Sequence, residues 1–365
     1  MKISSIQTQI VRLPAEEPLA DGPVAAGTTR DFVTLRIGTD AGIEGIGITF
    51  FGGALIGTLR TAVDALGTLA IGEDPLRIEA LIGKLRAAAA PCGPGGILTL
   101  ALAAIDIALW DIKGKALNLP LSKLIGGRRE RVPTYASGAL MRQFSLEDVL
   151  KAAPRLVERG FRQMKMQLAL PGNISVPREV ERARLIRASV GDEIDLMCDI
   201  NQLWDVRQAI SIGKQIEDVH LYWLEDVVAH DDYAGLARVA AALDTPVAGG
   251  EYVYGSVPFR HMLEARSVDI VMIDVLRAGG ITQWLKIAGM AEAFNLPVVS
   301  HLIPELHVHL ISAIPNGLTV EYMPWSVKLF EEVPLPDKGE LQVPDKPGHG
   351  LVFNEDVLRR YGESS

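Results

Sequence analysis

Three carboxylates recur at a fixed interval in the middle of the sequence: Asp199, Glu225 and Glu251 lie 26 residues apart. Each ends a short apolar run, and the runs read IDLMCD, LYWLE and PVAGGE. If these runs are neighbouring parallel strands, about 4.8 Å apart, the carboxylates converge on one point, and their mutual repulsion favours a bound cation. Oxygen ligands with open positions suit Mg²⁺. The spacing therefore predicts an Mg²⁺ site, and Asn201, on the same face as Asp199, is expected to hydrogen-bond a ligand there.

An acid and a histidine end the next two apolar runs. Asp274 closes DIVMID and His301 closes LPVVSH, so the two side chains are expected to meet across neighbouring strands. A carboxylate that holds one imidazole nitrogen fixes the tautomer and raises the basicity of the ring. The pair therefore predicts a general base.

A rival metal site is offered by the segment HLIPELHVH, which places four ligand-type side chains within nine residues. Glu305 and His309 have the i, i+4 spacing of one helix face, but residues 307 and 309 diverge on a helix. The four side chains, His301, Glu305, His307 and His309, are therefore not expected to face one point.

These residues belong to a regular series. From 131 to 324, short β-branched runs alternate with helical stretches, and the polar residues that mark the runs lie 20 to 34 residues apart. That interval fits one strand and one helix, so eight runs predict a closed (β/α)8 barrel with its polar residues at the carboxyl ends of the strands, where barrel enzymes build their sites. The eight are Ser137, Lys165, Asp199, Glu225, Glu251, Asp274, His301 and Glu321. Gln167 shares a strand face with Lys165, so an amine and an amide are expected to emerge together.

The first 130 residues have a different pattern. The opening KISSIQTQIVRL alternates like a strand, and a predicted hairpin turns at TDAG. Helical periodicity follows over 54–90 and 97–117, interrupted by PCGPGG. An α+β domain is expected here.

Composition narrows the function and the compartment. With 36 basic and 45 acidic residues the net charge is −9, which argues against nucleic acid and against an anionic membrane surface as partners. The most apolar stretch, 95–110, contains Asp106 and falls short of the roughly 20 residues that a membrane span needs. Two cysteines, Cys92 and Cys198, are too few for a disulfide framework, and no targeting segment is recognised, so a cytoplasmic location is expected.

Taken together, these motifs resemble the enolase superfamily, and within it the mandelate racemase subgroup (the mandelate racemase/muconate lactonizing enzyme family). The resemblance covers nearly the whole chain and rests on EGIGITF, ALAAIDIALWDIKGKALNLPLSKLIGG, GFRQMKMQ, CDIN, WLED, GGE, DVLRAGGIT and SHL. It implies a modified (β/α)8 TIM-type barrel over 131–324, and a capping domain over 1–130 that is completed by 325–365. It also implies a homo-oligomer and Mg²⁺-assisted removal of the proton α to a carboxylate.

The resemblance gives roles to three further residues. Lys165 matches the first lysine of a Lys-x-Lys motif and would contact the substrate carboxylate, which Glu321 would also hydrogen-bond. Ser137 is a further donor. Gln167 departs from the pattern, because it stands where the subgroup has a second basic lysine and an amide takes no proton near neutral pH; we expect it to hydrogen-bond the substrate. Residues 225–227 read Glu-Asp-Val where Glu-Glu-Pro is common.

The resulting hypothesis is an acid-sugar dehydratase. His301 would take the α proton and return it to the departing 3-hydroxyl, giving a 2-keto-3-deoxy acid. One alternative is a racemase, epimerase or lactone cycloisomerase that uses Lys165 or a loop residue as second proton donor. Another, of a different class, is an Mg²⁺-binding protein without turnover.

Substrate identity is expected to depend on two loops of the capping domain, 15–30 and the FFGG of 50–53. Phe50 and Phe51 either cover the site or pack in the domain interface. Polar residues of the first loop that are candidates for contacting substrate are Asp21, Thr28, Thr29 and Arg30.

Overall fold

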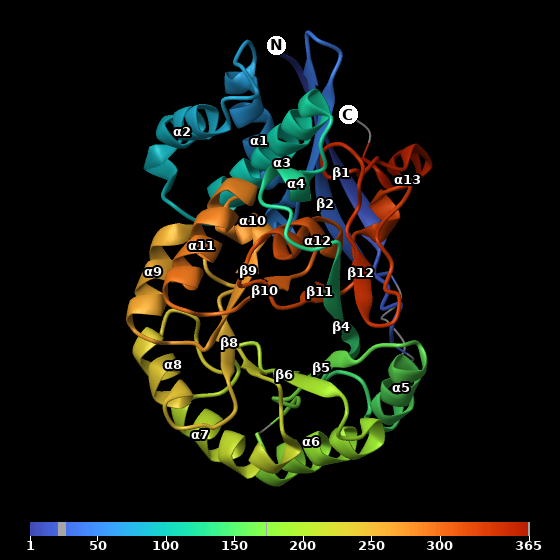
Figure 1. The fold of residues 1–365 in the computed structure, drawn as a ribbon, viewed down its shortest axis with the longest axis vertical. Coiled ribbons are helices and arrows are strands. Elements are labelled where there is room, and N and C mark those ends of the chain that lie inside the picture. The colour runs from blue at the N-terminus through green and yellow to red at the C-terminus, as the bar shows by residue number, and fades with distance from the viewer. Residues whose placement is uncertain (21–26, 173, 364–365) are drawn as a thin grey trace.

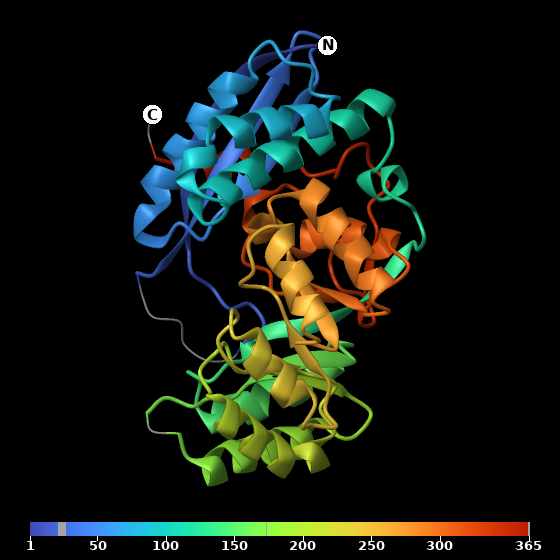
Figure 2. The same ribbon diagram turned by 90° about the vertical axis from the view of Figure 1, so that its left-hand side faces the viewer.

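The computed structural model describes residues 1–20, 27–172 and 174–363 (Figure 1). Asp21, one of the candidates in the first loop, lies outside the described residues. The N-terminal part is a three-stranded antiparallel sheet with helices packed on it (Figure 2). Strand β2 pairs with both of the other strands and so lies between them. Its elements are β1 (Ile3–Pro14), β2 (Thr29–Thr39), β3 (Glu44–Thr49), α1 (Ile56–Ala70), α2 (Ile78–Ala88), α3 (Ile97–Leu117) and α4 (Leu121–Leu124).

Helix α3 joins this sheet to the rest of the molecule. Two glycines of β3 let the helix approach closely: a Cβ at Gly45 would lie 2.2 Å from the carbonyl oxygen of Ala108, and one at Gly47 2.1 Å from that of Ala104. On another side of α3, buried Asp106 accepts hydrogen bonds from the backbone N–H of Thr282 at 2.9 Å and from its hydroxyl at 2.5 Å. The helix is apolar around almost its whole circumference, as expected for a helix that is covered on several sides.

The second part is a parallel eight-stranded barrel. Strand order follows chain order from β4 to β10, and β11 pairs with β4. Between β10 and β11 the ladder shrinks to a bridge at Val298 and Gly317, so the barrel is nearly closed. Its strands are β4 (Arg131–Leu140), β5 (Gln163–Gln167), β6 (Asp195–Asp199), β7 (Leu224–Glu225), β8 (Val247–Gly249), β9 (Ile270–Asp274), β10 (Val298–His301) and β11 (Val320–Tyr322).

Helices cover the outside of the barrel, and several begin at a side-chain cap. The Asp205 carboxylate accepts from the backbone N–H of Gln208, whose side chain returns a bond to residue 205, and Ser145 and Asp232 cap two other helices. The helices are α5 (Leu146–Glu158), α6 (Val176–Val190), α7 (Val206–Gln215), α8 (Tyr233–Ala240), α9 (Ser256–Glu264), α10 (Val275–Ala278), α11 (Ile281–Ala293) and α12 (Pro304–Ala313). Short 3-10 turns lie at η1 (Gly53–Leu55), η2 (Ala90–Cys92), η3 (Glu217–Val219) and η4 (Val327–Leu329).

The interior of the barrel is packed rather than hollow. A separate cluster of buried side chains fills it, in which the rings of Tyr135 and Trp223 meet edge to face with centroids 5.4 Å apart. The cluster consists of Tyr135, Met197, Trp223, Ala248, Ile270, Met272 and Val299. The polar residues at the carboxyl ends of the strands therefore lie directly above a packed apolar core.

The C-terminal segment returns to both parts. Strand β12 (Glu340–Gln342) pairs antiparallel with β4 of the barrel, and α13 (Glu355–Tyr361) lies beside β1. Gly362 bridges to Val11, and the backbone N–H of Glu363 donates to the carbonyl oxygen of Ile10 at 2.9 Å. Both views place this segment against the N-terminal sheet (Figures 1 and 2). These contacts support the division that we propose, a capping domain of 1–130 with 325–365 around a barrel of 131–324.

The predicted fold class, an α/β barrel with an added antiparallel sheet domain, is confirmed. None of the helices among the described residues has the length and apolar character needed to cross a membrane.

Candidate active site

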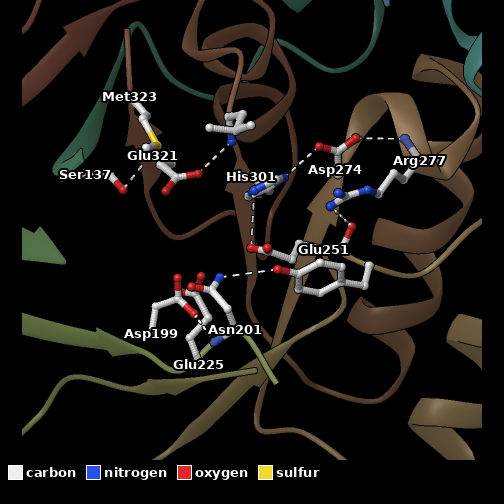
Figure 3. Close-up of polar contacts among 12 residues, drawn as sticks. Ser137, Asp199, Asn201, Glu225, Glu251, Asp274, Arg277, His301, Glu321 and Met323 are labelled. Atoms are coloured by element: carbon white, nitrogen blue, oxygen red, sulfur yellow. Dashed lines mark hydrogen bonds and ion pairs between the residues drawn. The ribbon is translucent and has the colours of Figure 1, made fainter. Parts of the chain in front are cut away.

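A cavity of about 260 Å³ opens at the carboxyl ends of the barrel strands, on the side of the capping domain. Eight of the ten residues predicted for the site line it, and Figure 3 shows six of these, Lys165 and Gln167 excepted, approaching from different strands. The eight are Ser137, Lys165, Gln167, Asp199, Asn201, Glu251, His301 and Glu321. The other two, Glu225 and Asp274, lie directly behind the lining and bond to Lys165 and His301.

Lys165 is held between two buried carboxylates. Its Nζ lies 2.5 Å from Oε1 of Glu225 and 2.9 Å from Oε1 of Glu321. Burial lowers the pKa of Lys165, but the two carboxylates outweigh it and raise the pKa well above its usual value. The ammonium therefore stays charged near neutral pH, which suits it to bind an anion and not to take a proton.

Carboxylates from β7 and β8 form a cluster with the donor set of a hard cation. Oxygens of Glu225, Asp226 and Glu251 lie within 4.8 Å of one another, and all three residues are buried. This differs from the predicted set, in which Asp199 stood in place of Asp226. The backbone explains the difference: Asp226 has a left-handed φ of 44°, so the alternation of strand side chains breaks and Glu225 and Asp226 reach the same region.

Asp199 lies beside this cluster with both oxygens engaged. Its Oδ1 accepts from the backbone N–H of Asn201 at 2.7 Å, and its Oδ2 accepts from the Gln167 amide at 3.2 Å. The same amide reaches Asn201 Oδ1 at 3.1 Å, and Asn201 donates to the Tyr252 hydroxyl at 3.3 Å. Gln167 and Asn201 thus orient Asp199 from the rim of the cavity.

The electrostatics of the cluster fit a bound cation. Burial, with Asp199 and Glu321, raises the pKa of Glu225 to about 7 even though Lys165 lowers it. Burial and the neighbouring carboxylates raise the pKa of Asp226 and Glu251 well above their usual values. One buried oxygen, Oδ2 of Asp226, has no hydrogen-bond partner. Crowded oxygen donors with an unpartnered acceptor are the environment that a divalent cation relieves.

His301 and Asp274 form the predicted dyad. His301 Nδ1 lies 2.7 Å from Oδ2 of Asp274, while its Nε2 lies 3.3 Å from Oε2 of Glu251 (Figure 3). The other oxygen of Asp274 caps α10 by accepting from the backbone N–H groups of Leu276 at 2.8 Å and Arg277 at 2.7 Å. The carboxylate is therefore oriented before it meets the imidazole. Burial lowers the pKa of His301, but Glu251 and Asp274 raise it to about 9.

The rival metal site does not assemble. His307 Nδ1 bonds to the carbonyl oxygen of Leu302 at 2.7 Å, and His309 Nε2 lies 3.1 Å from the carbonyl oxygen of His349. Glu305 accepts from Ser326 at 2.7 Å. Of the four candidate ligands, only His301 faces the cavity, as the helical spacing predicts.

Ser137 occupies a different position from the one expected. Strand β4 continues to Leu140, so Ser137 lies inside the strand, where the ladder to β5 is irregular. Gly138, with φ 95°, turns the chain at this point, and both residues line the cavity. The Ser137 hydroxyl donates a weak hydrogen bond to the sulfur of Met323 at 3.7 Å, which a stronger acceptor such as a ligand oxygen would replace.

The two phenylalanines of the second loop have separate roles. Phe50 is buried against Phe32, with ring centroids 5.2 Å apart, whereas Phe51 has a φ of 69° and turns into the cavity. The Phe51 ring lies parallel to His301, with centroids 6.1 Å apart. Phe51 therefore takes the covering position, whereas Phe50 packs on strand β2 within the capping domain.

The first loop reaches the site through Trp325, which was not predicted. Trp325 lines the cavity and donates through Nε1 to Oε2 of Glu17 at 3.1 Å. Arg30 pairs with Glu17 and lies over the Trp325 ring, 4.2 Å from its centroid, rather than facing the cavity. Thr29 bonds to Asp31 at the surface.

Tyr252 and Arg277 also line the cavity without having been predicted. The Arg277 guanidinium carbon lies 3.9 Å from the ring centroid of Phe51 and 4.8 Å from that of Tyr252, and Nη1 donates to the carbonyl oxygen of Glu251 at 3.0 Å. Their positions in the sequence could have indicated them as lining residues, because Tyr252 directly follows the predicted ligand Glu251 and Arg277 lies three residues after Asp274.

Comparison with known proteins identifies the family. Residues 6–126 match the model for the mandelate racemase / muconate lactonizing enzyme N-terminal domain, and 148–357 match the enolase C-terminal domain-like model. The chain is 32% identical over 362 residues to 3,6-anhydro-alpha-L-galactonate cycloisomerase of Streptomyces coelicolor, spanning 98% of this chain and 99% of the relative. It is 32% identical over 368 residues to L-talarate/galactarate dehydratase of Salmonella typhimurium, spanning 98% and 90%. The chain belongs to the mandelate racemase/muconate lactonizing enzyme family of the enolase superfamily.

A solved structure extends the likeness to the whole fold. L-Talarate dehydratase from Polaromonas sp. JS666, complexed with Mg and L-glucarate, superposes with a TM-score of 0.91 at 31% identity, and the match covers 100% of this chain and 98% of that one. A racemase from Streptomyces coelicolor with bound magnesium also has a TM-score of 0.91. The predicted family and Mg²⁺ cofactor are confirmed. The enzyme class is confirmed as well, since the relatives are sugar-acid dehydratases with a cycloisomerase among them.

Proposed function

We propose that the protein is an Mg²⁺-dependent acid-sugar dehydratase, which removes the proton α to a carboxylate and expels the 3-hydroxyl to give a 2-keto-3-deoxy acid. The observation that carries this proposal is an asymmetry of the cavity. The His301–Asp274 dyad supplies a base from one direction, whereas Lys165 is locked between Glu225 and Glu321 and residue 167 is an amide. Dehydration needs one acid-base group, and stereochemical inversion needs two.

We propose that Mg²⁺ is held by Asp199, Glu225 and Glu251, with Asp226 adjacent to them. When bound, the ion neutralises the second negative charge that develops on the substrate carboxylate as the α proton leaves. Lys165 binds the same carboxylate through its ammonium. Glu321 positions Lys165 and is itself fixed by the backbone N–H of Leu302 at 2.7 Å.

His301 carries the proton. Its Nε2 faces the cavity, and a cation bound at Glu251 would offset the largest effect that raises the pKa of the imidazole, so the neutral ring would accept the α proton at Nε2 while Asp274 holds Nδ1–H and stabilises the imidazolium. The same N–H then donates to the oxygen that leaves carbon 3, and water departs. Gln167, Asn201 and Ser137 offer hydrogen bonds to the remaining substrate oxygens, and Phe51 covers the imidazole face and excludes water.

A substrate panel tests the proposal. Aldonic and aldaric acids are incubated with the Mg²⁺-loaded enzyme, and 2-keto acid formation is followed with and without a chelator. Chelator-sensitive product supports the dehydratase. If neither product nor deuterium exchange at the α carbon is found for any acid, the protein belongs instead to the class that binds Mg²⁺ without turnover.

The similarity to a cycloisomerase favours a second candidate function, the ring opening of a cyclic ether, which would use the same residues. If the oxygen on carbon 3 belongs to a ring ether, its expulsion opens the ring and the atoms stay in one molecule, so the product is an isomer. Mass spectrometry of the products separates the two, because dehydration lowers the mass of the substrate by one water and ring opening leaves it unchanged. An epimerase would instead show α-carbon exchange without either product.

Two wider properties also remain proposals. We propose a cytoplasmic location, supported by the free thiols of Cys92 and Cys198. We propose a homo-oligomer, supported by exposed apolar side chains on the capping domain such as Leu69, Ile71 and Leu117. Light scattering on the purified protein checks the second.

A further inference from the structure

The part of the cavity away from the metal cluster has a wall without charge. It is formed by residues from β4 and from the segment after β11, two strands that pair with each other and lie across the barrel from β7 and β8. We call these residues the tail wall: Ser137, Gly138, Met141, Met323 and Trp325. It presents a hydroxyl, a glycine backbone, two thioethers and an indole.

A carboxylate stands directly behind this wall. The Glu17 side chain is only 8% exposed, and its Oε2 accepts from Trp325 Nε1 at 3.1 Å. The same oxygen would lie 3.0 Å from a Cβ placed on Gly138, so it approaches the cavity through the gap that the glycine leaves. The cation nearest to it, Arg30, is engaged by Glu17 and by the carbonyl oxygen of Glu16 at 2.7 Å.

The two permanently cationic side chains of the lining are already matched by carboxylates. Lys165 lies between Glu225 and Glu321 and is assigned to the reacting carboxylate. Arg277 lies against the rings of Phe51 and Tyr252, donates to the backbone of Glu251, and has Asp274 beside it. In the part of the chain that the structure describes, the lining thus holds no further arginine or lysine for a second substrate carboxylate.

We infer that the site selects sugar acids with one carboxylate, the aldonates, over those with two, the aldarates, because the substrate tail meets an uncharged wall backed by Glu17. This rests on the proposed function and deepens it. The relatives do not decide the matter, since both talarate/galactarate and arabinonate dehydratases are among them. A second carboxylate at the tail wall would be desolvated without a cationic partner, because Arg30 behind Trp325 is already paired with Glu17 and the Glu17 oxygen lies nearer to the gap at Gly138, and this is strongly unfavourable.

Matched acid pairs test the inference. Galactonate and galactarate, or gluconate and glucarate, differ only at carbon 6. We expect kcat/KM of the Mg²⁺-loaded enzyme to favour the aldonate of an accepted pair by at least about tenfold, in line with the penalty for like charges in contact. An aldarate turned over as well as its aldonate would overturn the inference and leave the dehydratase proposal standing.

A charge change behind the wall makes the test specific. Glu17→Gln removes the carboxylate and releases Arg30, so the aldonate preference should fall by about tenfold, the size expected for one removed like-charge contact. Glu16→Gln is the matched control: it makes the same change one residue away, where the side chain pairs with Lys328 at the surface. An unchanged ratio in Glu17→Gln, or an equal fall in both variants, would overturn the role of Glu17.

A measurement of substrate affinity tests this inference independently of the proposed dehydration reaction. Isothermal titration of the His301→Asn variant with Mg²⁺ and each acid pair reports affinity without turnover. Tighter binding of aldonates supports the selectivity even if the product is not a keto acid. Equal or tighter binding of aldarates, or binding of neither class, would overturn it.

Discussion

His301 is oriented by a chain of contacts that begins in the backbone. Two N–H groups at the start of α10 fix Asp274, and Asp274 fixes the imidazole. His301→Asn should therefore abolish both α-proton exchange and product formation, while Mg²⁺ affinity stays close to that of the wild type.

Asp274→Asn should reduce the rate by roughly 10²–10⁴-fold, the range of a general-base contribution, because the imidazole loses the carboxylate that fixes its tautomer. Deuterium exchange followed by NMR and titration with Mg²⁺ provide the measurements; retained dehydration in His301→Asn would move the proton transfer to Lys165.

Asp199 and Asp226 compete for the third ligand position. If Asp199 is the ligand, Asp199→Asn should weaken Mg²⁺ binding more than Asp226→Asn, for which a loss of about 10–100-fold is typical of a carboxylate outside the coordination sphere. Calorimetric titration of the metal-free variants measures both. The reverse order would assign the ion to the cluster of Glu225, Asp226 and Glu251.

At the scale of elements, the contact of β3 with α3 determines where the capping sheet lies. Gly47→Ala should destabilise the protein by several kcal/mol, because the new Cβ would overlap the Ala104 carbonyl and force strand and helix apart. Gly57→Ala is the matched control, since its Cβ in helix α1 meets nothing within 4 Å and should stabilise by about 0.5–1 kcal/mol. Urea unfolding of both variants tests the pair; equal effects would show that the approach at Gly47 tolerates a methyl group.

Elements were predictable from the sequence where a period or a breaker marked them. The strand and helix repeat predicts the barrel, and the interval 97–117 coincides with α3. What could not be predicted depends on single backbone angles. Phe50 and Phe51 look alike in sequence, and only the left-handed φ of Phe51 turns its ring into the cavity. Asp226 likewise has a left-handed φ, which brings its carboxylate into the cluster with Glu225.

Other features depend on contacts between distant segments. Glu17 and Trp325 are 308 residues apart, and no local pattern connects them. The His301–Asp274 pair and the carboxylates of the cavity could be predicted because their chemistry and their spacing agree. Apart from Ser137, the residues of the tail wall were missed because methionine, glycine and tryptophan carry no comparable signal.

On the scale of the whole molecule, three buried histidines contribute to the response of stability to acid. Burial, together with His349, lowers the pKa of His309 to about 3, so His309 is neutral in the folded protein and charged in the unfolded chain below its ordinary pKa of 6.5. The unfolded state then binds more protons than the folded state. As the pH is lowered from 6.5 to 3, the free energy of unfolding therefore decreases by about 1.4 kcal/mol per pH unit for this residue. His307 and His349 also have lowered pKa values and act in the same direction.

His309→Gln should flatten that dependence by about 1.4 kcal/mol per unit between pH 6 and 4, whatever its effect at pH 7.5. Urea unfolding at several pH values is the measurement. His261→Gln, at an exposed surface position, is the control and should leave the slope unchanged. Parallel curves for the wild type and His309→Gln would show that His309 is protonated equally in both states.

The pairing of residues near position 362 with β1 has a consequence for synthesis. β1 is an edge strand, and among the residues that the structure describes, Val11 and Ile10 obtain their outer partners from Gly362 and Glu363. At 5–20 residues per second, roughly 20–70 s separate the translation of these segments. Throughout that interval the nascent sheet presents an unpaired edge of the kind that other chains can join. The risk of aggregation during translation therefore falls on the first strand, while the barrel behind it is still being made.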